Sequence, residues 1–183
     1  MKKLAELTNK EIINLLSRQA HVELQSSFLY LQYAYWFDNN NFEGIGKFFK
    51  AESEEERKHS VQIFDYLNVR GVQVAIDPQQ TAFSNLKTHF EKPGDYFEAY
   101  LAREHLNYSL LDQIGKQAQQ TEEILTHKFI GSMLEDQASS VDEAEKLYAK
   151  AQAYSAFPGL FYHLDAQIKK GSQSFDTWKA KQS

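Results

Sequence analysis

The sequence contains no cysteine, which excludes disulfide bonds, thiolate metal sites and a cysteine nucleophile. A metal ion in this protein must therefore be bound by oxygen and imidazole ligands. Proline and glycine are scarce, with 3 and 8 occurrences in 183 residues, and this scarcity indicates long helices. No apolar run is long enough for a signal peptide or a membrane span, so we expect a cytoplasmic protein without a membrane partner.

Positive charge is also limited, because 20 lysine and arginine residues stand against 25 acidic residues and the net charge is -5. The basic residues do not cluster, so we expect no nucleic-acid partner. What is present is ordinary for a globular protein, with 42% hydrophobic and 25% charged residues. The length suits one domain, and we predict a single unit over residues 1–183.

Hydrophobic residues recur at alternating steps of three and four along four long segments, which predicts four long helices. A short fifth helix and a polar tail are expected after Pro158. The expected elements cover about residues 9–38, 43–70, 94–119, 122–156 and 159–170, with the tail at 171–183.

Residues 71–92, between the second and third predicted helices, lack helical periodicity. An extended link of this length can reach about 70 Å, whereas a helix of about 28 residues is about 42 Å long. The link can therefore cross the full length of a bundle. The prediction is an all-α fold: a four-helix bundle over about residues 9–156 with one long crossover.

Polar residues interrupt the apolar stripe near the middle of each long helix. The interrupting residues are Glu23, Glu56, His59, Glu104, Gln137 and Ser140. Similar distances from the helix ends would place them at one level of the bundle. Burying three carboxylates together costs several kcal/mol each through lost hydration, and a bound cation relieves this cost. Glu56 and His59 are three residues apart and leave the same helix face, which suits iron, manganese or zinc.

Each part of this pattern has an ordinary interpretation when it stands alone. A core histidine is usually only hydrogen-bonded, the charge run 54–58 could be a solvated helix face, and Tyr30 could be core packing. The coincidence of polar interruptions on four helices is what favours a metal site.

Taken together, these residues resemble those of the ferritins. The resemblance rests on Glu23 with Tyr30 seven residues later, on the segments 55–59 and 103–111, and on Asp136 with Gln137. It extends over about residues 8–170 and includes the crossover and the fifth helix. The ferritin-like fold and an iron-storage function are what the resemblance implies.

The resemblance also implies a ferroxidase centre that holds two irons. Glu23 and His59 would bind the first iron, Glu56 would bridge the two, and Glu104 would bind the second. Gln137 is expected beside the metal pair, both as a ligand position and as a group that hydrogen-bonds water or peroxide. Tyr30 would hydrogen-bond a ligand or donate an electron.

Further implications concern the surroundings of the centre and the assembly. Glu55 and Asp136 are candidates for an accessory iron site. The expected assembly is a hollow homo-oligomeric cage of twenty-four subunits that stores ferric mineral, with oxygen or hydrogen peroxide as the oxidant. No haem is expected, because Met133 lies on the core stripe.

The sequence departs from the family pattern at two places. Many di-iron bundles carry a second Glu-x-x-His on the fourth helix, where this chain has Gln137 and Ser140. The second iron then lacks a strong anchor, which favours a transit site. At the start of the fourth helix, His127 and Ile130 stand where animal ferritins carry acidic channel residues.

Two other functions remain open from the sequence. One is a di-iron oxidase or peroxidase without iron storage, although the missing second histidine argues against it. The other is a non-catalytic subunit that nucleates mineral, or a plain structural bundle, and the four residues Glu23, Glu56, His59 and Glu104 argue against that.

Overall fold

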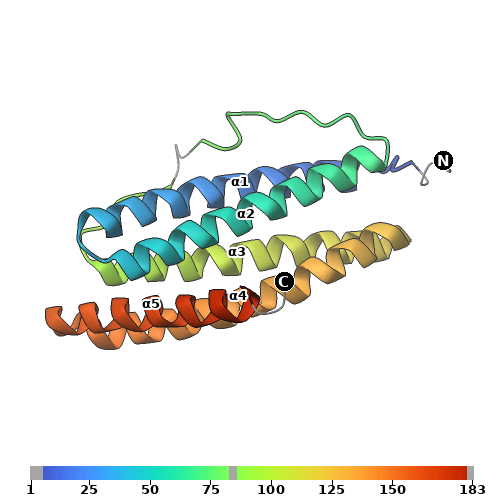
Figure 1. The fold of residues 1–183 in the computed structure, drawn as a ribbon. Helices are drawn as coiled ribbons and strands as arrows, with labels where there is room; N and C mark the ends of the chain where they lie inside the picture. Colours follow the sequence, from blue (N-terminus) through green and yellow to red (C-terminus); the bar gives the residue numbers. More distant parts are fainter. Residues whose placement is uncertain (1–5, 83–85, 181–183) are drawn as a thin grey trace.

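The computed structural model describes residues 6–82 and 86–180. In this part of the chain there are five helices and no strand: α1 (Lys10–Asn39), α2 (Glu43–Val69), α3 (Pro93–Gln120), α4 (Ile124–Ser155) and α5 (Pro158–Ala180). Figure 1 shows α1 beside α2, α3 beside α4, and the connection from α2 to α3 running along the bundle. The predicted all-α bundle with one long crossover and a fifth helix is confirmed.

Local chemistry explains where the first two helices begin and end. Asn9 caps α1, because its side-chain oxygen accepts hydrogen bonds from the backbone N–H groups of Glu11 (3.0 Å) and Ile12 (3.2 Å). Asn41, with φ of 64°, makes the turn from α1 into α2. Gly71, with φ of 78°, ends α2 in the left-handed conformation that glycine adopts without strain.

The fifth helix is longer than the sequence predicts. We expected it to end at about residue 170 and a polar tail to follow, but α5 continues to Ala180, and 181–183 lie outside the described residues. The expectation was wrong because polar composition indicates solvation and not the absence of a helix. No proline follows Pro158, and one glycine inside a helix costs only about 1 kcal/mol.

The first turns of α5 are fixed to the start of α2. Phe161 and Leu164 are buried, and Asp165 accepts a hydrogen bond of 2.8 Å from the backbone N–H of Ile45. Lys169 forms an ion pair of 3.1 Å with Glu43. These contacts place the junction of α4 and α5 at the same end of the bundle as the turn from α1 to α2.

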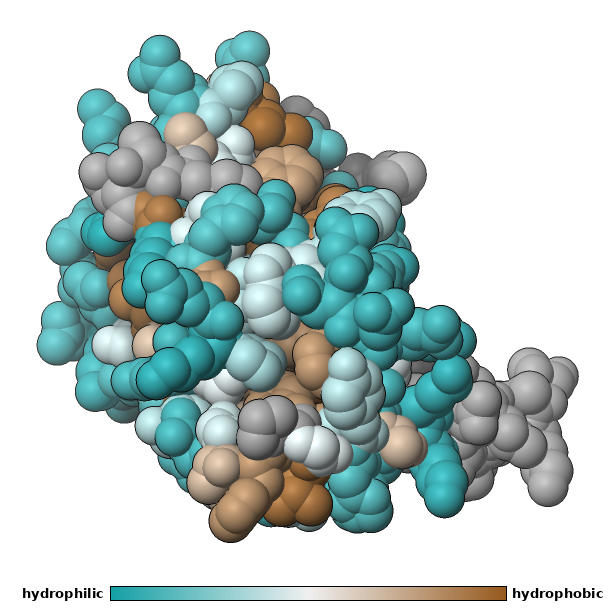
Figure 2. Space-filling model, turned by 90° about the vertical axis from the view of Figure 1, so that its left-hand side faces the viewer, coloured by the Kyte–Doolittle hydropathy of each residue, from teal (hydrophilic) through white to brown (hydrophobic). Residues whose placement is uncertain are grey.

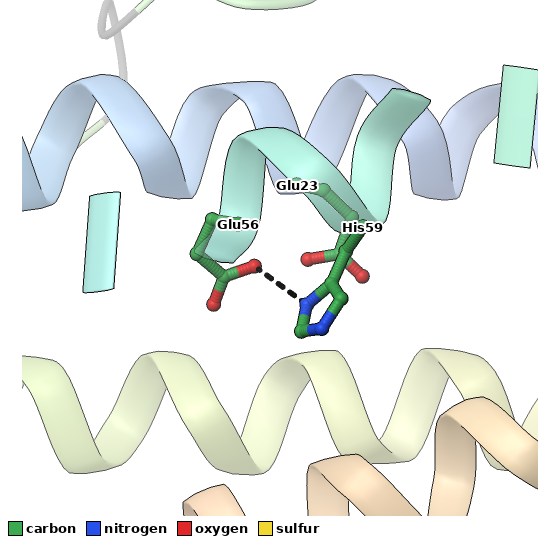
Figure 3. Close-up of side chains that lie close together, drawn as sticks. All are labelled: Glu23, Glu56 and His59. Atoms are coloured by element: carbon green, nitrogen blue, oxygen red, sulfur yellow. Dashed lines mark ion pairs between the residues drawn. The ribbon is translucent and has the colours of Figure 1, made fainter. Parts of the chain in front are cut away.

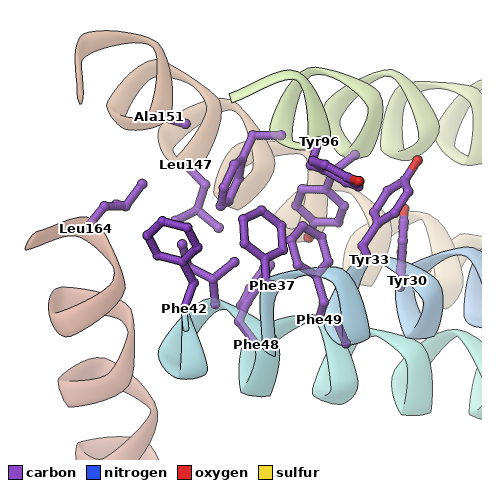
Figure 4. Packing of buried hydrophobic residues seen from close by; sticks show 14 of the residues in the cluster. Tyr30, Tyr33, Phe37, Phe42, Phe48, Phe49, Tyr96, Leu147, Ala151 and Leu164 are labelled. Atoms are coloured by element: carbon purple, nitrogen blue, oxygen red, sulfur yellow. The ribbon is translucent and has the colours of Figure 1, made fainter. Parts of the chain in front are cut away.

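Two apolar clusters fill the bundle, one towards each end. The cluster near the turn from α1 to α2, here called the aromatic end, is rich in rings, including those of Tyr30, Tyr33, Phe37, Phe48, Phe49 and Tyr96 (Figure 4). The other cluster, here called the aliphatic end, includes Ile12, Leu16, Ile63, Leu67, Ile114 and Ile130. On each of the four long helices, the polar residues singled out above lie between these two clusters.

The crossover packs along α1 over most of its length. Val72 and Val74 contact the aliphatic end, whereas Leu86 and Phe90 contact the aromatic end. In between, His21 on α1 accepts a hydrogen bond of 2.9 Å from the backbone N–H of Asp77. The crossover therefore holds α2 and α3 parallel, as its length predicts. Within the described residues, every helix is too polar or too short to cross a lipid bilayer.

Candidate metal centre

Three metal-ligating side chains meet in the polar layer between the two apolar ends. Glu23 comes from α1, and Glu56 and His59 come from successive turns of α2 (Figure 3). One ligand atom from each of the three lies within 4.8 Å of the others. Glu23 is 0% and Glu56 4% exposed, while the side chain of His59 is 22% exposed. This is the arrangement that a divalent cation with oxygen and imidazole ligands requires.

The carboxyl groups of this layer favour their protonated forms. Burial, with the negative charge of Glu104 acting in the same direction, raises the pKa of Glu56 to about 8. Burial raises the pKa of Glu23 well above its usual value, and the charge of Glu56 acts in the same direction. The 3.7 Å between His59 Nδ1 and Glu56 Oε2 is too long for a hydrogen bond. These carboxyl groups therefore retain protons that a metal ion would displace.

Glu104 on α3 lies in the same layer, but its oxygens already have donors. Tyr30 donates its hydroxyl to Glu104 Oε1, and Gln137 on α4 donates its amide N–H to Glu104 Oε2 at 2.5 Å. Burial raises the pKa of Glu104, and the charge of Glu23 acts in the same direction. The structure thus brings Glu104, Gln137 and Tyr30 to the edge of the centre.

Acceptor atoms without donors are concentrated around Glu23 and Glu56. Among the described residues, the buried side-chain polar atoms that lack a hydrogen-bond partner are Gln19 Oε1, Glu56 Oε2 and Asn107 Oδ1. All three are oxygens, and Gln19 and Asn107 both donate to Glu23 through their amide nitrogens. Buried oxygens in native proteins normally have a partner. A cation with its bound water would supply the partners missing here.

Other predicted residues lie outside this cluster. Glu55 is exposed and forms an ion pair of 2.8 Å with Lys58, and Asp136 is also exposed. The hydroxyl of Ser140 donates to the backbone oxygen of Asp136 on its own helix at 3.4 Å. The charge run is thus a solvated face, except for Glu56, which points into the bundle. The structure does not bring Glu55 and Asp136 into contact with the three central ligands.

Asn107 on α3 is a buried residue of the polar layer that the sequence pattern does not single out. On the third predicted helix, alternating steps of three and four predict Tyr108 on the core stripe, but Tyr108 is 41% exposed, whereas Asn107 is 0% exposed. The predicted stripe continues four residues after Glu104, whereas the inward-facing residue of α3 lies three residues after it. Alternating steps of three and four connect Glu104 to Leu111 through either Asn107 or Tyr108, so periodicity alone does not identify Asn107.

Arg103, next to Glu104, was also missed and ties α3 to α1. Its guanidinium donates to Ser26 Oγ at 2.7 Å and to the backbone oxygen of Val22 at 2.8 Å. Arg103 is 5% exposed, so its charge is buried beside the carboxyl layer. It fixes the two helices that carry Glu23 and Glu104 relative to each other.

Comparison with known proteins indicates the family of the chain. A family model described as a ferritin-like domain matches residues 13–153, which contain nearly all of the four long helices and every residue of the centre. The chain belongs to the ferritin family. The bacterial non-heme ferritin of Staphylococcus saprophyticus is 30% identical over 136 residues, which cover 72% of this chain and 79% of the relative. Family and fold together support a ferritin of the iron-storage kind.

Solved ferritin structures share the fold. An open pore ferritin from the archaeon Archaeoglobus fulgidus superimposes with a TM-score of 0.81 at 21% identity, over 88% of this chain and 96% of the other. A PmFTN variant soaked in iron gives a TM-score of 0.80 at 26% identity, over 86% of this chain and 98% of the other.

Proposed function

We propose that this ferritin oxidises Fe(II) to Fe(III) at a di-iron centre in the polar layer and stores the ferric product as mineral inside a homo-oligomeric cage. The observation that carries the proposal is the group formed by Glu23, Glu56 and His59, whose ligand atoms lie within 4.8 Å of one another. Buried carboxyl groups with raised pKa values, surrounded by oxygens that lack donors, are unfavourable without a cation.

Iron enters this scheme as the substrate. Glu23 and His59 bind the first Fe(II), Glu56 bridges to the second, and Glu104 binds the second. Binding displaces the protons that the carboxyl groups hold before iron arrives. Each Fe(II) supplies one electron, so two neighbouring ions supply the pair of electrons that converts O₂ to the peroxide level or hydrogen peroxide to water.

The two metal positions differ in strength. Glu104 shares its oxygens with Tyr30 and Gln137, and Ser140 turns towards the backbone of its own helix. Neither a neutral amide nor a hydroxyl is a strong iron ligand. The second iron is therefore bound weakly and leaves after oxidation, which lets the centre turn over repeatedly and feed a mineral.

The cage is supported by apolar side chains that remain uncovered in the single chain. Phe157, Leu160 and Tyr162 are 63%, 40% and 55% exposed at the junction of α4 and α5. Figure 2 looks onto this end of the molecule and shows hydrophobic patches within a mostly hydrophilic surface. Large exposed apolar groups typically mark contacts between proteins. We propose that these groups contact other subunits in an assembly of twenty-four.

The test adds Fe(II) without oxygen and then admits air, while absorbance follows ferric iron and native mass spectrometry reports the assembly. We expect a large cage with a fast oxidation phase, which is lost in His59→Ala and in Glu56→Ala while the cage persists. Glu54→Ala is the matched control, because Glu54 is on the same helix but exposed and paired with Arg57. Equal fast phases in all four proteins would reject the centre.

The same experiment separates storage from its alternatives. A storage protein retains many ferric ions per subunit after desalting, whereas a di-iron oxidase without storage retains only those of its centre. A mineral-nucleating subunit would retain iron without a fast phase. Retention of many ions together with a fast phase is the result that the proposal requires.

A further inference from the structure

Asn107 occupies the centre of the polar layer, one helical turn after Glu104 on α3. Its side chain is 0% exposed. The amide nitrogen lies 3.0 Å from Glu23 Oε2 and 3.5 Å from Glu56 Oε1. One neutral amide on α3 therefore connects carboxyl groups that come from two other helices.

Glu23 receives a neutral donor at each of its oxygens. Gln19 donates its amide N–H to Oε1 at 2.7 Å, and Asn107 donates to Oε2. Neither donor carries charge. The nearest buried guanidinium on α3, that of Arg103, donates instead to Ser26 and to the backbone of Val22. Glu23 is thus oriented by hydrogen bonds without a positive charge in contact with it.

The absence of charge on these donors matters for metal binding. A lysine or arginine in the place of Asn107 would also hold Glu23, but it would repel an incoming cation and compete with it. An apolar residue would not repel the cation, but it would leave the two carboxyl groups without a common donor. An amide combines orientation with neutrality, and its second polar atom, Oδ1, has no hydrogen-bond partner within the protein.

We propose that Asn107 is a positioning residue for the first metal ion. Its amide nitrogen keeps Glu23 and Glu56 facing each other before metal binds, and its free Oδ1 accepts a hydrogen bond from water on the bound ion. This inference rests on the proposed function, because it assumes that Glu23, Glu56 and His59 hold a divalent cation. Asn107 acts through the two carboxylates and not by contact with the ion.

A positioning role makes a specific prediction for a variant of the same size. Asn107→Leu keeps the volume and removes both polar atoms. Residues that orient metal ligands typically contribute 10- to 100-fold to affinity. We expect the dissociation constant of the first site to rise by about tenfold. The apparent KM for Fe(II) should rise by a similar factor with little change in kcat, because Glu23, Glu56 and His59 remain in place.

The test is an anaerobic titration of the assembled protein with Co²⁺, which oxygen-free solution keeps divalent and whose visible absorption reports ligand geometry. The variants are Asn107→Leu and Asn107→Ala, so that misfolding of one does not decide the result. Asn68→Leu is the matched control, since Asn68 is exposed on α2. Far-ultraviolet circular dichroism verifies that each variant folds.

Each outcome has a defined meaning. Weaker Co²⁺ binding and an altered visible spectrum in both Asn107 variants, with the control unchanged, supports the positioning role. If both variants fold and bind Co²⁺ as the unmodified protein does, Asn107 only fills space and the inference is overturned. If the unmodified protein binds no Co²⁺ at this site, the proposed function itself fails, and the inference fails with it.

Discussion

In the aromatic end of the bundle, Phe49 packs against the rings of Tyr33 and Phe37 with centroids 5.6 Å away in each case. Further along the same helices, where α1 presents Glu23 and α2 presents Glu56, the interior consists of carboxyl groups, amides and one imidazole. Among the described residues, no buried side-chain polar atom in the aromatic end lacks a hydrogen-bond partner. The polar layer leaves three buried oxygens without a donor.

This contrast separates what stabilises the protein from what it uses for chemistry. A fully buried aromatic or aliphatic side chain contributes about 1.5–3 kcal/mol to folding. A buried carboxyl group opposes folding unless it is protonated, hydrogen-bonded or bound to a cation. The two apolar ends therefore provide the stability that holds the polar layer together, and the layer gains its own partners only when metal binds.

The largest expected effect on stability lies in the aromatic end. Phe49 is 0% exposed and contacts rings on all sides, so Phe49→Ala leaves a cavity in a rigid setting. We expect the free energy of unfolding to fall by about 3–5 kcal/mol. Chemical denaturation followed by circular dichroism measures this change. A loss below about 1 kcal/mol would mean that the aromatic end is loosely packed and that the contrast with the polar layer is incorrect.

The second prediction concerns the polar layer without metal. Because burial raises the pKa of Glu56 to about 8, the folded protein binds this proton more tightly than the unfolded chain does. This contribution to stability is complete below pH of about 4.5 and is lost as pH rises towards about 8. We therefore expect the free energy of unfolding of the metal-free protein to decrease over this range.

Glu56→Gln tests that prediction, because glutamine cannot ionise. The variant should show a weaker pH dependence and should be more stable than the unmodified protein at pH of about 8.5, by about 1–3 kcal/mol. Glu54→Gln is the matched control, since Glu54 is exposed and Arg57 lowers its pKa by hydrogen bonding. If Glu56→Gln and Glu54→Gln change the pH profile equally, the polar layer does not store protons.

The same contrast explains how far the sequence could predict the structure. The four long helices and the crossover follow from periodicity and from Pro and Gly positions, because apolar burial dominates helix packing. The same apolar stripes also show where polar residues interrupt them, at Glu23, Glu56, His59 and Glu104. The layer in which they lie was therefore predictable, and the structure places them between the two apolar ends.

What could not be predicted depends on contacts between helices. Hydrophobicity does not distinguish Asn107 from Tyr108 as the inward residue, and only the packed bundle shows Asn107 donating to Glu23 from another helix. The length of α5 was missed because a polar segment can be helical or irregular. The sequence also does not show that Tyr100 on α3 donates a hydrogen bond of 2.6 Å to Glu52 on α2.

Tyr30 lies on the boundary between the aromatic end and the polar layer. Removing its hydroxyl is the smallest change that tests the contrast between these two regions. Its ring belongs to the aromatic end, 5.2 Å from that of Tyr100, while its hydroxyl donates to Glu104 in the polar layer. Burial and the charge of Glu104 raise the pKa of Tyr30 well above its usual value, so the hydroxyl stays protonated and remains a donor.

Tyr30→Phe removes this one oxygen and keeps the ring, so the aromatic end should be unaffected. We expect stability to change by about 1 kcal/mol or less, because Glu104 loses one donor and keeps Gln137. Iron binding should persist, while oxidation slows or passes through different coloured intermediates, because a hydrogen-bonding and electron-donating group beside the second iron is gone. Rapid-mixing absorption spectroscopy of both proteins, loaded with equal Fe(II), makes the comparison.

Tyr33→Phe is the control, since Tyr33 lies in the same cluster of rings and not beside Glu104. Superimposable spectra and rates for Tyr30→Phe and the unmodified protein would assign Tyr30 wholly to the aromatic end, whereas a change confined to Tyr30→Phe would assign its hydroxyl to the metal centre.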